Sequence, residues 1–217
     1  MTTIILTTTV YVNKNKDYLF QVDPNNRLKL YLESITKWLE ETPFNIIVVD
    51  NSGYQYNEFY DEKRIYHHRF EVISFKENDL KLSYYLKNIK SKGASEIFAI
   101  NYAFYNSRLK YKTNFIIKVT GRFFVKKLVG FLNQYDLTKY DAIRQFDIDR
   151  CELVGCRHDH FWYIFNIALL TDANNYEPHI ETIWRDRILK YDNIITCDAF
   201  PINPTQRGGV NESFAII

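Results

Sequence analysis

Glycine and proline are scarce in this sequence of 217 residues, which contains only seven glycines and five prolines. Average proteins hold about 12% of these two residues together, more than twice the share found here. The scarcity excludes collagen-like, linker-rich and Pro/Gly-type disordered chains. Glycine-rich phosphate loops are also missing, because neither G-x-G-x-x-G nor G-x-x-x-x-G-K-S/T occurs. A protein of this composition that binds phosphates must use side-chain cations, hydroxyls, helix N-termini or a metal.

An excess of charge of one sign is lacking too, since 28 lysines and arginines face 26 aspartates and glutamates and leave a net charge of +2. Proteins that bind nucleic acids or membrane surfaces usually carry a concentrated basic patch, so neither partner is expected. No apolar run approaches the ~20 residues of a membrane span, and no signal segment is found. The three cysteines, Cys151, Cys156 and Cys197, form no disulfide framework and indicate a reducing compartment. We therefore expect a soluble, cytoplasmic protein.

What the sequence does contain is an alternation of buried-strand and amphipathic-helix patterns. Thr2 to Val12 is rich in β-branched residues and predicts a buried strand. Asp23-Pro24 supplies an N-cap and a first-turn proline for a helix that extends to about Glu41. Phe44 to Val49 is a second buried strand, so the first fifty residues form a βαβ unit, which favours a parallel sheet.

The rest of the chain continues this alternation, and its length fits one large domain or two small ones. The segment from residue 160 to 170 is strongly apolar, and its periodicity fits a strand or a buried helix equally well. We predict one α/β domain with a central, mostly parallel mixed sheet flanked by helices. Further strands are predicted at Phe70–Phe75, Phe115–Ile117 and Tyr140–Phe146, and further helices begin at Ser91, Phe123 and Pro178.

Three predicted strands end in polar residues, at Thr7–Thr9, Asp50–Gly53 and Lys118–Arg122. In open α/β sheets, ligands bind at the carboxyl ends of the strands, near the point where the strand order reverses. The Asp-Asn-Ser-Gly sequence that begins at Asp50 presents a carboxylate and two small hydrogen-bonding side chains, which suit a base edge or ribose hydroxyls. The alternative is that these four residues form an ordinary turn.

Four motifs follow one another along the chain in a recognisable order. They are the Thr-rich first strand, the Asp-Asn-Ser-Gly strand end, a Lys-Gly-x-x-Glu helix start at Lys92 and a Lys-x-Thr-Gly-Arg-Phe turn at Lys118. This order resembles that of nucleotide-sugar glycosyltransferases of the GT-A fold, especially the small domains encoded by large DNA viruses such as the chlorella viruses. The resemblance spans roughly residues 2 to 190.

The resemblance implies a single glycosyltransferase domain over residues 1–217, with a nucleotide-sugar half up to about residue 122 and an acceptor half and tail after it. It implies transfer of a hexosyl group from a UDP-sugar to a hydroxyl of a glycan or glycoprotein, without an organic cofactor. It also places the protein in the host-cell cytoplasm if the chain is viral.

The donor site that the resemblance implies lies at the ends of the first two strands, where Thr8, Thr9, Asp50 and Asn51 hold the nucleotide. The helix start at Lys92-Gly93 closes over the donor. A helix N-terminus beside a lysine also suits a diphosphate on physical grounds. The third strand end completes the implied site with Lys118, Thr120 and Arg122.

One departure from the family concerns the metal. The family places an Asp-x-Asp motif, which holds Mn²⁺ or Mg²⁺, where this chain reads Lys118-Val119-Thr120-Gly121-Arg122. Either Lys118 and Arg122 neutralise the diphosphate without a metal, or the metal is held elsewhere. For the second case the chain offers Asp147 and Asp149, its only literal Asp-x-Asp, and Asp79 as an alternative.

The densest polar cluster, from Glu152 to His160, stands beside the aromatic Phe161-Trp162-Tyr163. Carboxylates and imidazoles next to aromatic rings fit a sugar-binding surface, and deprotonation of an acceptor hydroxyl requires a base. A solvated surface cluster is the alternative interpretation. We predict acceptor binding by His158, His160 and Trp162 and catalysis by Asp147, Asp149 and Asp159; by position alone, the resemblance adds Glu177 and Glu181 at the start of the last helix.

A different class of function stays open, namely a carbohydrate- or nucleotide-binding domain that keeps the fold without turnover, because the Asp-x-Asp motif is missing at its usual place. A sugar nucleotidyltransferase on a similar fold is disfavoured. That chemistry generally uses a glycine- and basic-rich loop after the first strand, which this chain lacks.

Overall fold

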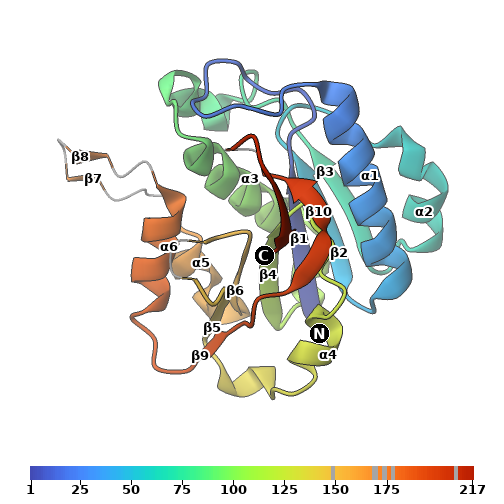
Figure 1. Ribbon diagram of the computed structural model, residues 1–217, viewed down its shortest axis with the longest axis vertical. Helices are drawn as coiled ribbons and strands as arrows, with labels where there is room; N and C mark the ends of the chain where they lie inside the picture. Colours follow the sequence, from blue (N-terminus) through green and yellow to red (C-terminus); the bar gives the residue numbers. More distant parts are fainter. Residues whose placement is uncertain (148–149, 168–170, 173–174, 177–178, 208–209) are drawn as a thin grey trace.

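The computed structural model describes residues 1–147, 150–167, 171–172, 175–176, 179–207 and 210–217. Its centre is a seven-stranded sheet of order β3-β2-β1-β4-β6-β5-β9 (Figure 1). The first four strands in this order are parallel, β6 is antiparallel to both β4 and β5, and β9 is parallel to β5. This confirms the predicted mixed, mostly parallel sheet. The strands are β1 (Thr2–Thr8), β2 (Asn45–Asp50), β3 (Phe70–Ser74), β4 (Phe115–Thr120), β5 (Ala142–Arg144), β6 (Leu153–Arg157) and β9 (Ile194–Thr196).

The helices begin where the sequence supplies caps. α1 (Pro24–Glu41) starts after Asp23, whose carboxylate accepts hydrogen bonds from the amides of Asn25 (3.1 Å) and Asn26 (3.3 Å). α3 (Lys92–Asn106) is capped by the Ser91 hydroxyl.

Among the described residues, no helix is both long enough and apolar enough to span a membrane. The other elements are α2 (Tyr60–Ile65), α4 (Leu128–Leu132), α5 (Phe161–Ile164), α6 (Ile180–Ile188), the 3-10 turns η1 (Asn57–Phe59), η2 (Lys81–Asn88), η3 (Leu109–Lys112), η4 (Leu137–Lys139) and η5 (His158–His160), and the short pairs β7 (Thr171–Asp172) with β8 (Asn175–Tyr176) and β10 (Pro201–Gln206) with β11 (Ser213–Ile216).

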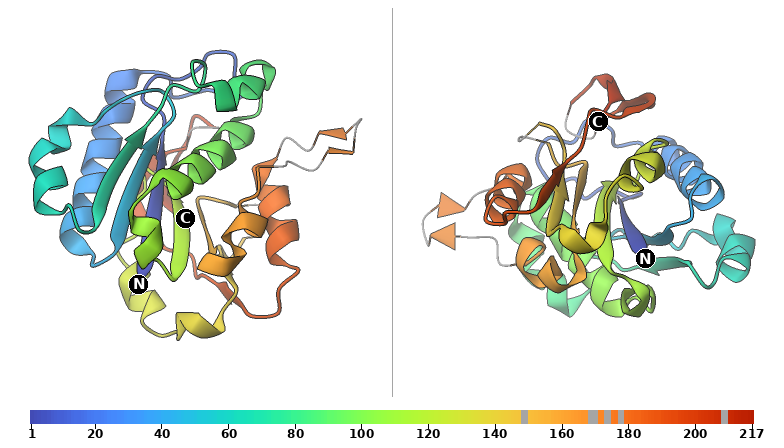
Figure 2. Two further views of the ribbon diagram at one scale, coloured as in Figure 1. Left: turned by 180° about the vertical axis from the view of Figure 1, so that it is seen from behind. Right: turned by 90° about the horizontal axis from the view of Figure 1, so that it is seen from below.

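The sheet separates two hydrophobic cores, and successive residues of its strands point into opposite ones. On β1, Ile4 and Leu6 pack into the core that contains Trp38 of α1, whereas Ile5 packs into the core that contains Ile97 of α3. α1 covers one face of the sheet, and α3, α5 and α6 cover the other (Figures 1 and 2). Each fully buried aliphatic or aromatic side chain of this kind contributes about 1.5–3 kcal/mol of transfer free energy.

β6 is the strand that the sequence pattern concealed. The segment that we interpreted as the start of a polar cluster is a buried strand of five residues between β4 and β5. Gly155 is required there, because a Cβ at this position would lie 2.4 Å from the carbonyl oxygen of Ile116 on the neighbouring strand. β5 is also shorter than predicted and ends at Arg144.

The antiparallel direction of β6 divides the predicted cluster between the two edges of the sheet. At its start, the carbonyl of Glu152 accepts a hydrogen bond from the Thr120 amide (2.9 Å), at the carboxyl end of β4. At its end, the His158 amide donates to the carbonyl of Asn114 (2.8 Å), just before β4 begins. Glu152 and His158 therefore lie at opposite edges.

Candidate functional site

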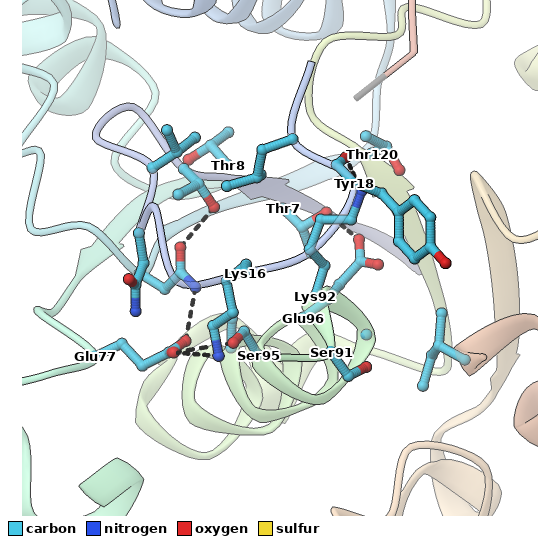
Figure 3. Close-up of a pocket in the computed structure, with 18 of the residues that line it drawn as sticks. Thr7, Thr8, Lys16, Tyr18, Glu77, Ser91, Lys92, Ser95, Glu96 and Thr120 are labelled. Atoms are coloured by element: carbon cyan, nitrogen blue, oxygen red, sulfur yellow. Dashed lines mark hydrogen bonds and ion pairs between the residues drawn. The ribbon is translucent and has the colours of Figure 1, made fainter. Parts of the chain in front are cut away.

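A pocket of about 1240 Å³ opens at the carboxyl edge of the parallel strands (Figure 3). Its wall is formed by the ends of β1, β2 and β4, the loop from residue 9 to 23, the first turn of α3, and the starts of β6 and α6. The volume exceeds the 300–1,000 Å³ that is typical of small-molecule sites, so a ligand with several parts fits. Of the residues predicted for donor or metal binding, the wall contains Thr8, Thr9, Asn51, Asp79, Lys92, Gly93, Thr120 and Arg122.

Asp50 is predicted to contact the nucleotide, but it is fully buried and does not line the pocket. Its carboxylate accepts hydrogen bonds from the backbone amides of Val10 (3.1 Å), Ser52 (2.8 Å) and Tyr54 (3.1 Å). It also accepts from the Thr8 hydroxyl (3.1 Å). The expected contact is thus corrected: Asp50 shapes the loops that follow β1 and β2 rather than facing a ligand.

Lys118 also lies beneath the wall, with a side chain that is 0% exposed. Its ammonium group is 2.8 Å from Glu96 Oε1 and donates to the carbonyl of Cys151 (2.7 Å). Burial disfavours the charged amine, but Glu96 and the other acidic groups nearby outweigh it, so the pKa of Lys118 is raised and the lysine stays charged. The sequence predicts that Lys118 contacts a diphosphate directly. The structure corrects this expectation, because Lys118 holds the side chain of Glu96 instead.

Glu96 was missed by the sequence reasoning, although it is the glutamate of the Lys-Gly-x-x-Glu helix start. It lines the pocket from the second turn of α3. The Thr7 hydroxyl donates to the same carboxylate oxygen that Lys118 contacts, at 2.7 Å. Two donors therefore fix the orientation of this carboxylate at the junction of β1, β4 and α3; Figure 3 shows Glu96 and Thr7.

The start of α3 presents the positive end of the helix dipole to the pocket, together with Lys92. The Lys92 ammonium donates to the carbonyl of Tyr18 (2.7 Å) in the loop above it. Burial, and then the charge of Arg122, lowers the pKa of Lys92. Gly93 allows α3 to approach α6 closely, since a Cβ there would lie 2.6 Å from Cβ of Ile180. The helix N-terminus and the lysine side chain both favour the binding of an anion at this part of the pocket.

A buried network fixes the opposite wall of the pocket. Lys16, from the loop after β1, pairs with Glu77 Oε1 at 3.2 Å, and both side chains are under 10% exposed. Glu77 also accepts hydrogen bonds from Ser95 (2.9 Å) and from the amide of Asn51 (3.0 Å) (Figure 3). The network therefore joins the loop, the end of β2 and the start of α3. Neither Lys16 nor Glu77 belongs to a sequence motif, and only the folded chain brings them together.

Arg122 lines the pocket and is largely buried. One of its terminal nitrogens donates to the side chain of Gln21 and to the carbonyl of Gln206, both at 3.1 Å. Burial lowers the pKa of Arg122, which nevertheless remains far above neutrality because a guanidinium holds its proton in proteins. Arg122 thus connects the end of β4 to the C-terminal hairpin.

Charged residues also gather at the start of β6. The sequence pattern places Glu152 in a sugar-binding cluster and gives no role to Arg207. Arg207, from the C-terminal hairpin, places its Nε 3.0 Å from Glu152 Oε1. The thiol of Cys151 donates to Glu181 Oε1 at 3.4 Å. Glu181 lines the pocket from the first turn of α6 and has no ion-pair partner among the described residues. Glu177 lies outside the described residues.

The predicted acceptor residues do not reach the pocket. His158 and His160 belong to η5, at the other edge of the sheet, and the exposed Trp162 follows in α5. Asp159 pairs there with Arg157 at 2.8 Å. These positions correct the expectation that the whole cluster faces one ligand, because the antiparallel β6 carries the chain away from the carboxyl edge.

The predicted metal ligands are not gathered either. Asp147 lies beyond the end of β5, does not line the pocket and pairs with Arg150 at 3.3 Å, while Asp149 is outside the described residues. Asp79 lines the pocket but is 3.8 Å from the ammonium of Lys76. Among the described residues, no three His, Cys, Asp or Glu side chains are grouped as a metal site would need. With the cation of Lys118 at the end of β4, that strand end does not fit a divalent metal.

Comparison with known proteins identifies the type of fold that this chain adopts. No protein-family model matches the chain, and no curated protein matches it. The glycosyltransferase GlyE of Streptococcus pneumoniae matches 90% of this chain with a TM-score of 0.51 and 7% identity, and the match covers 44% of that chain. A protein of Desulfovibrio desulfuricans described as a nucleotide-diphospho-sugar transferase matches 91% of this chain with a TM-score of 0.49 and 17% identity, over 79% of its own. Staphylococcus aureus TarS 1-349 matches 90% with a TM-score of 0.46 and 10% identity, over 57% of its own. At such identities the likeness shows the fold alone, and that fold is of the GT-A type.

Proposed function

We propose that this chain is a glycosyltransferase that transfers a hexosyl group from a UDP-sugar to a hydroxyl of a glycan. The observation that supports this most is the pocket at the carboxyl edge of β1, β2 and β4, bordered by the start of α3, on a sheet of the GT-A type. Open α/β sheets bind nucleotides at this edge, beside the central strands at which the strand order reverses.

The two ends of the pocket suit the two ends of such a donor. The nucleoside lies between the loop after β1 and the end of β2, where Thr9 donates to Asn51 Oδ1 at 2.6 Å and the amide of Asn51 is held by Glu77. The diphosphate lies at the start of α3, near Lys92 and Arg122. The carboxylate of Glu96 faces the donor sugar and accepts hydrogen bonds from its hydroxyls.

Glu181 is the group that we assign to the transfer step. In a direct displacement, the acceptor oxygen forms a bond to C1 of the sugar while the bond from C1 to the β-phosphate oxygen breaks. The electron pair of the broken bond stays on that phosphate oxygen, and the proton of the acceptor hydroxyl goes to the Glu181 carboxylate. Among the described residues Glu181 forms no ion pair, which leaves its carboxylate suited to this task, whereas Glu96 and Glu152 each lie within 3.0 Å of a cation.

Calorimetric titration with UDP, GDP and CMP tests the donor assignment. We expect UDP to bind with the highest affinity, as the proposed UDP-sugar donor requires. Repeating the titration with Mn²⁺ and with EDTA tests the metal. Equal affinity in EDTA would remove the metal, and the absence of binding by all three nucleotides would contradict the proposed function.

A binding domain without turnover is the second candidate, and the lack of carboxylates at the end of β4 is the observation that favours it. Such a domain would bind UDP but leave UDP-sugars intact. Release of UDP from UDP-glucose by the purified protein would distinguish the two candidates.

A further inference from the structure

Two arginines, Arg150 and Arg207, stand together on the part of the pocket wall that lies next to β6. Arg150 comes from the segment before β6, and Arg207 comes from the C-terminal hairpin. Their side chains are only 18% and 20% exposed. The charge of Arg150 is among the causes that lower the pKa of Arg207, after burial itself, so the two guanidinium groups lie within electrostatic reach of each other. Two largely buried like charges repel each other, and the carboxylates of Asp147 and Glu152, one beside each arginine, offset part of that repulsion.

Among the described residues, neither guanidinium group has a hydrogen-bond partner for every N–H donor. Nη1 of Arg150 and Nη2 of Arg207 are buried and have no hydrogen-bond partner among the described residues. Each arginine has one carboxylate near its Nε, Asp147 for Arg150 and Glu152 for Arg207. A guanidinium group carries five N–H donors, and within the part of the chain that the structure describes only Nε of Arg150 donates a hydrogen bond from this pair. Buried donors without partners are rare and call for an explanation.

Aromatic rings hold the two guanidinium planes. The guanidinium carbon of Arg207 is 4.1 Å from the centre of the Phe214 ring, and that of Arg150 is 5.5 Å from the centre of the Phe146 ring. Stacking of this kind orients the fork of N–H groups before any ligand arrives, which reduces the entropy lost on binding. The pair is therefore a preorganised anion receptor rather than two loose surface arginines.

The pair lies near the carboxyl end of β4, the strand end at which the resemblance implies a metal site. Arg207 lies 3.0 Å from Glu152, whose carbonyl accepts a hydrogen bond from the Thr120 amide at 2.9 Å, and Thr120 is the last residue of β4. Both arginines line the same pocket as Lys92 and Arg122. The diphosphate assigned to this pocket therefore has Arg150 and Arg207 available in addition to the groups at the start of α3.

We propose that Arg150 and Arg207 bind the oxyanions of the donor diphosphate and stabilise the charge that develops on the leaving β-phosphate, taking the place of a divalent metal. This inference rests on the proposed function. When the bond from C1 to the β-phosphate oxygen breaks, the electron pair stays on that oxygen, and the two guanidinium forks donate hydrogen bonds to it without losing a proton. Lys118 cannot do this, because it is buried beneath the wall and paired with Glu96.

The test uses inorganic pyrophosphate, which carries the diphosphate chemistry without a nucleoside, titrated in EDTA into the wild-type protein and into Arg150→Gln and Arg207→Gln. We expect the wild type to bind, and each substitution to weaken binding by about tenfold, since each removes charge-assisted hydrogen bonds. Arg64→Gln is the matched control, because Arg64 is 75% exposed on α2, pairs with Asp61 and does not line the pocket. Arg207→Lys keeps the charge but loses the fork, and we expect an intermediate affinity. Thermal unfolding of each variant identifies any loss of folding.

The outcomes separate this inference from the proposed function. Pyrophosphate binding that is equal in the wild type and in both folded glutamine variants would overturn the inference, and so would binding that appears only when Mn²⁺ replaces EDTA. In either case, binding of UDP would leave the proposed function standing. Pyrophosphate binding that depends on the arginines, with no binding of UDP, GDP or CMP, would uphold the anion site and contradict the proposed function.

Discussion

At the scale of single residues, burial decides which polar side chain faces a ligand and which one supports the site. Asp50 and Asn51 are adjacent at the end of β2, yet Asp50 is fully buried whereas Asn51 lines the pocket. The sequence indicates a polar strand end at this place, but not which of its side chains turns inward. That choice depends on the backbone amides of Val10, Ser52 and Tyr54, which converge on the Asp50 carboxylate only after folding. Asp50 is therefore a stabilising residue in this account.

Replacing Asp50 tests this interpretation. We expect Asp50→Ala to lower the free energy of unfolding by about 2–4 kcal/mol, because several buried donors lose a charged acceptor. Urea denaturation measures the effect. Asp61→Ala is the control: the Asp61 side chain is 71% exposed, and its loss should change stability by less than about 0.5 kcal/mol. Unchanged stability of Asp50→Ala combined with a loss of UDP binding would instead make Asp50 a direct ligand contact.

At the scale of secondary-structure elements, periodicity and caps predict much of the fold, and close packing accounts for what they miss. The cap at Asp23 and the apolar stripe of α1 are both confirmed. β6 escaped prediction because it is only five residues long and lies directly between the polar Glu152 and His158. Its central residue is Gly155, which has no side chain to show a pattern. The glycine is there because the backbone of β4 approaches too closely for any other residue. Strand direction follows from long-range pairing, so the separation of Glu152 from His158 could not be predicted locally.

Two glycines in different elements give opposite predictions for the same substitution. We expect Gly155→Ala to lower the free energy of unfolding by about 1–3 kcal/mol, since its Cβ would meet the Ile116 carbonyl at 2.4 Å. Gly130→Ala in α4 should raise it by up to about 1 kcal/mol, because no atom lies within 4 Å of the new Cβ and alanine favours the helix. Chemical denaturation of both variants checks the pair. If Gly155→Ala proved as stable as the wild type, the close approach of β4 and β6 would be incorrect.

At the scale of the whole molecule, the pocket is assembled from both parts of the chain. The strand ends of β1, β2 and β4 and the start of α3 come from the first 122 residues, whereas Glu152, Glu181 and Arg207 come from the rest. The sequence locates the first set, because a strand followed directly by polar residues is a local signal. The second set reaches the pocket only because β6 reverses direction and the C-terminal hairpin returns to the end of β4. Arg207 from this second set lies near the end of β4, where the resemblance implies a metal site.

The central claim, that this pocket transfers sugars, is tested most directly by measuring the release of UDP from UDP-glucose, UDP-galactose and UDP-N-acetylglucosamine by the wild-type protein and by Glu181→Gln. The glutamine keeps an acceptor for the Cys151 thiol but cannot take a proton at neutral pH. We expect release from at least one donor by the wild type, a rate lower by about 100-fold or more in Glu181→Gln, and UDP affinity unchanged within about threefold. A wild-type protein that binds UDP but releases none from any of the three donors, or a Glu181→Gln variant as active as the wild type, would contradict the claim.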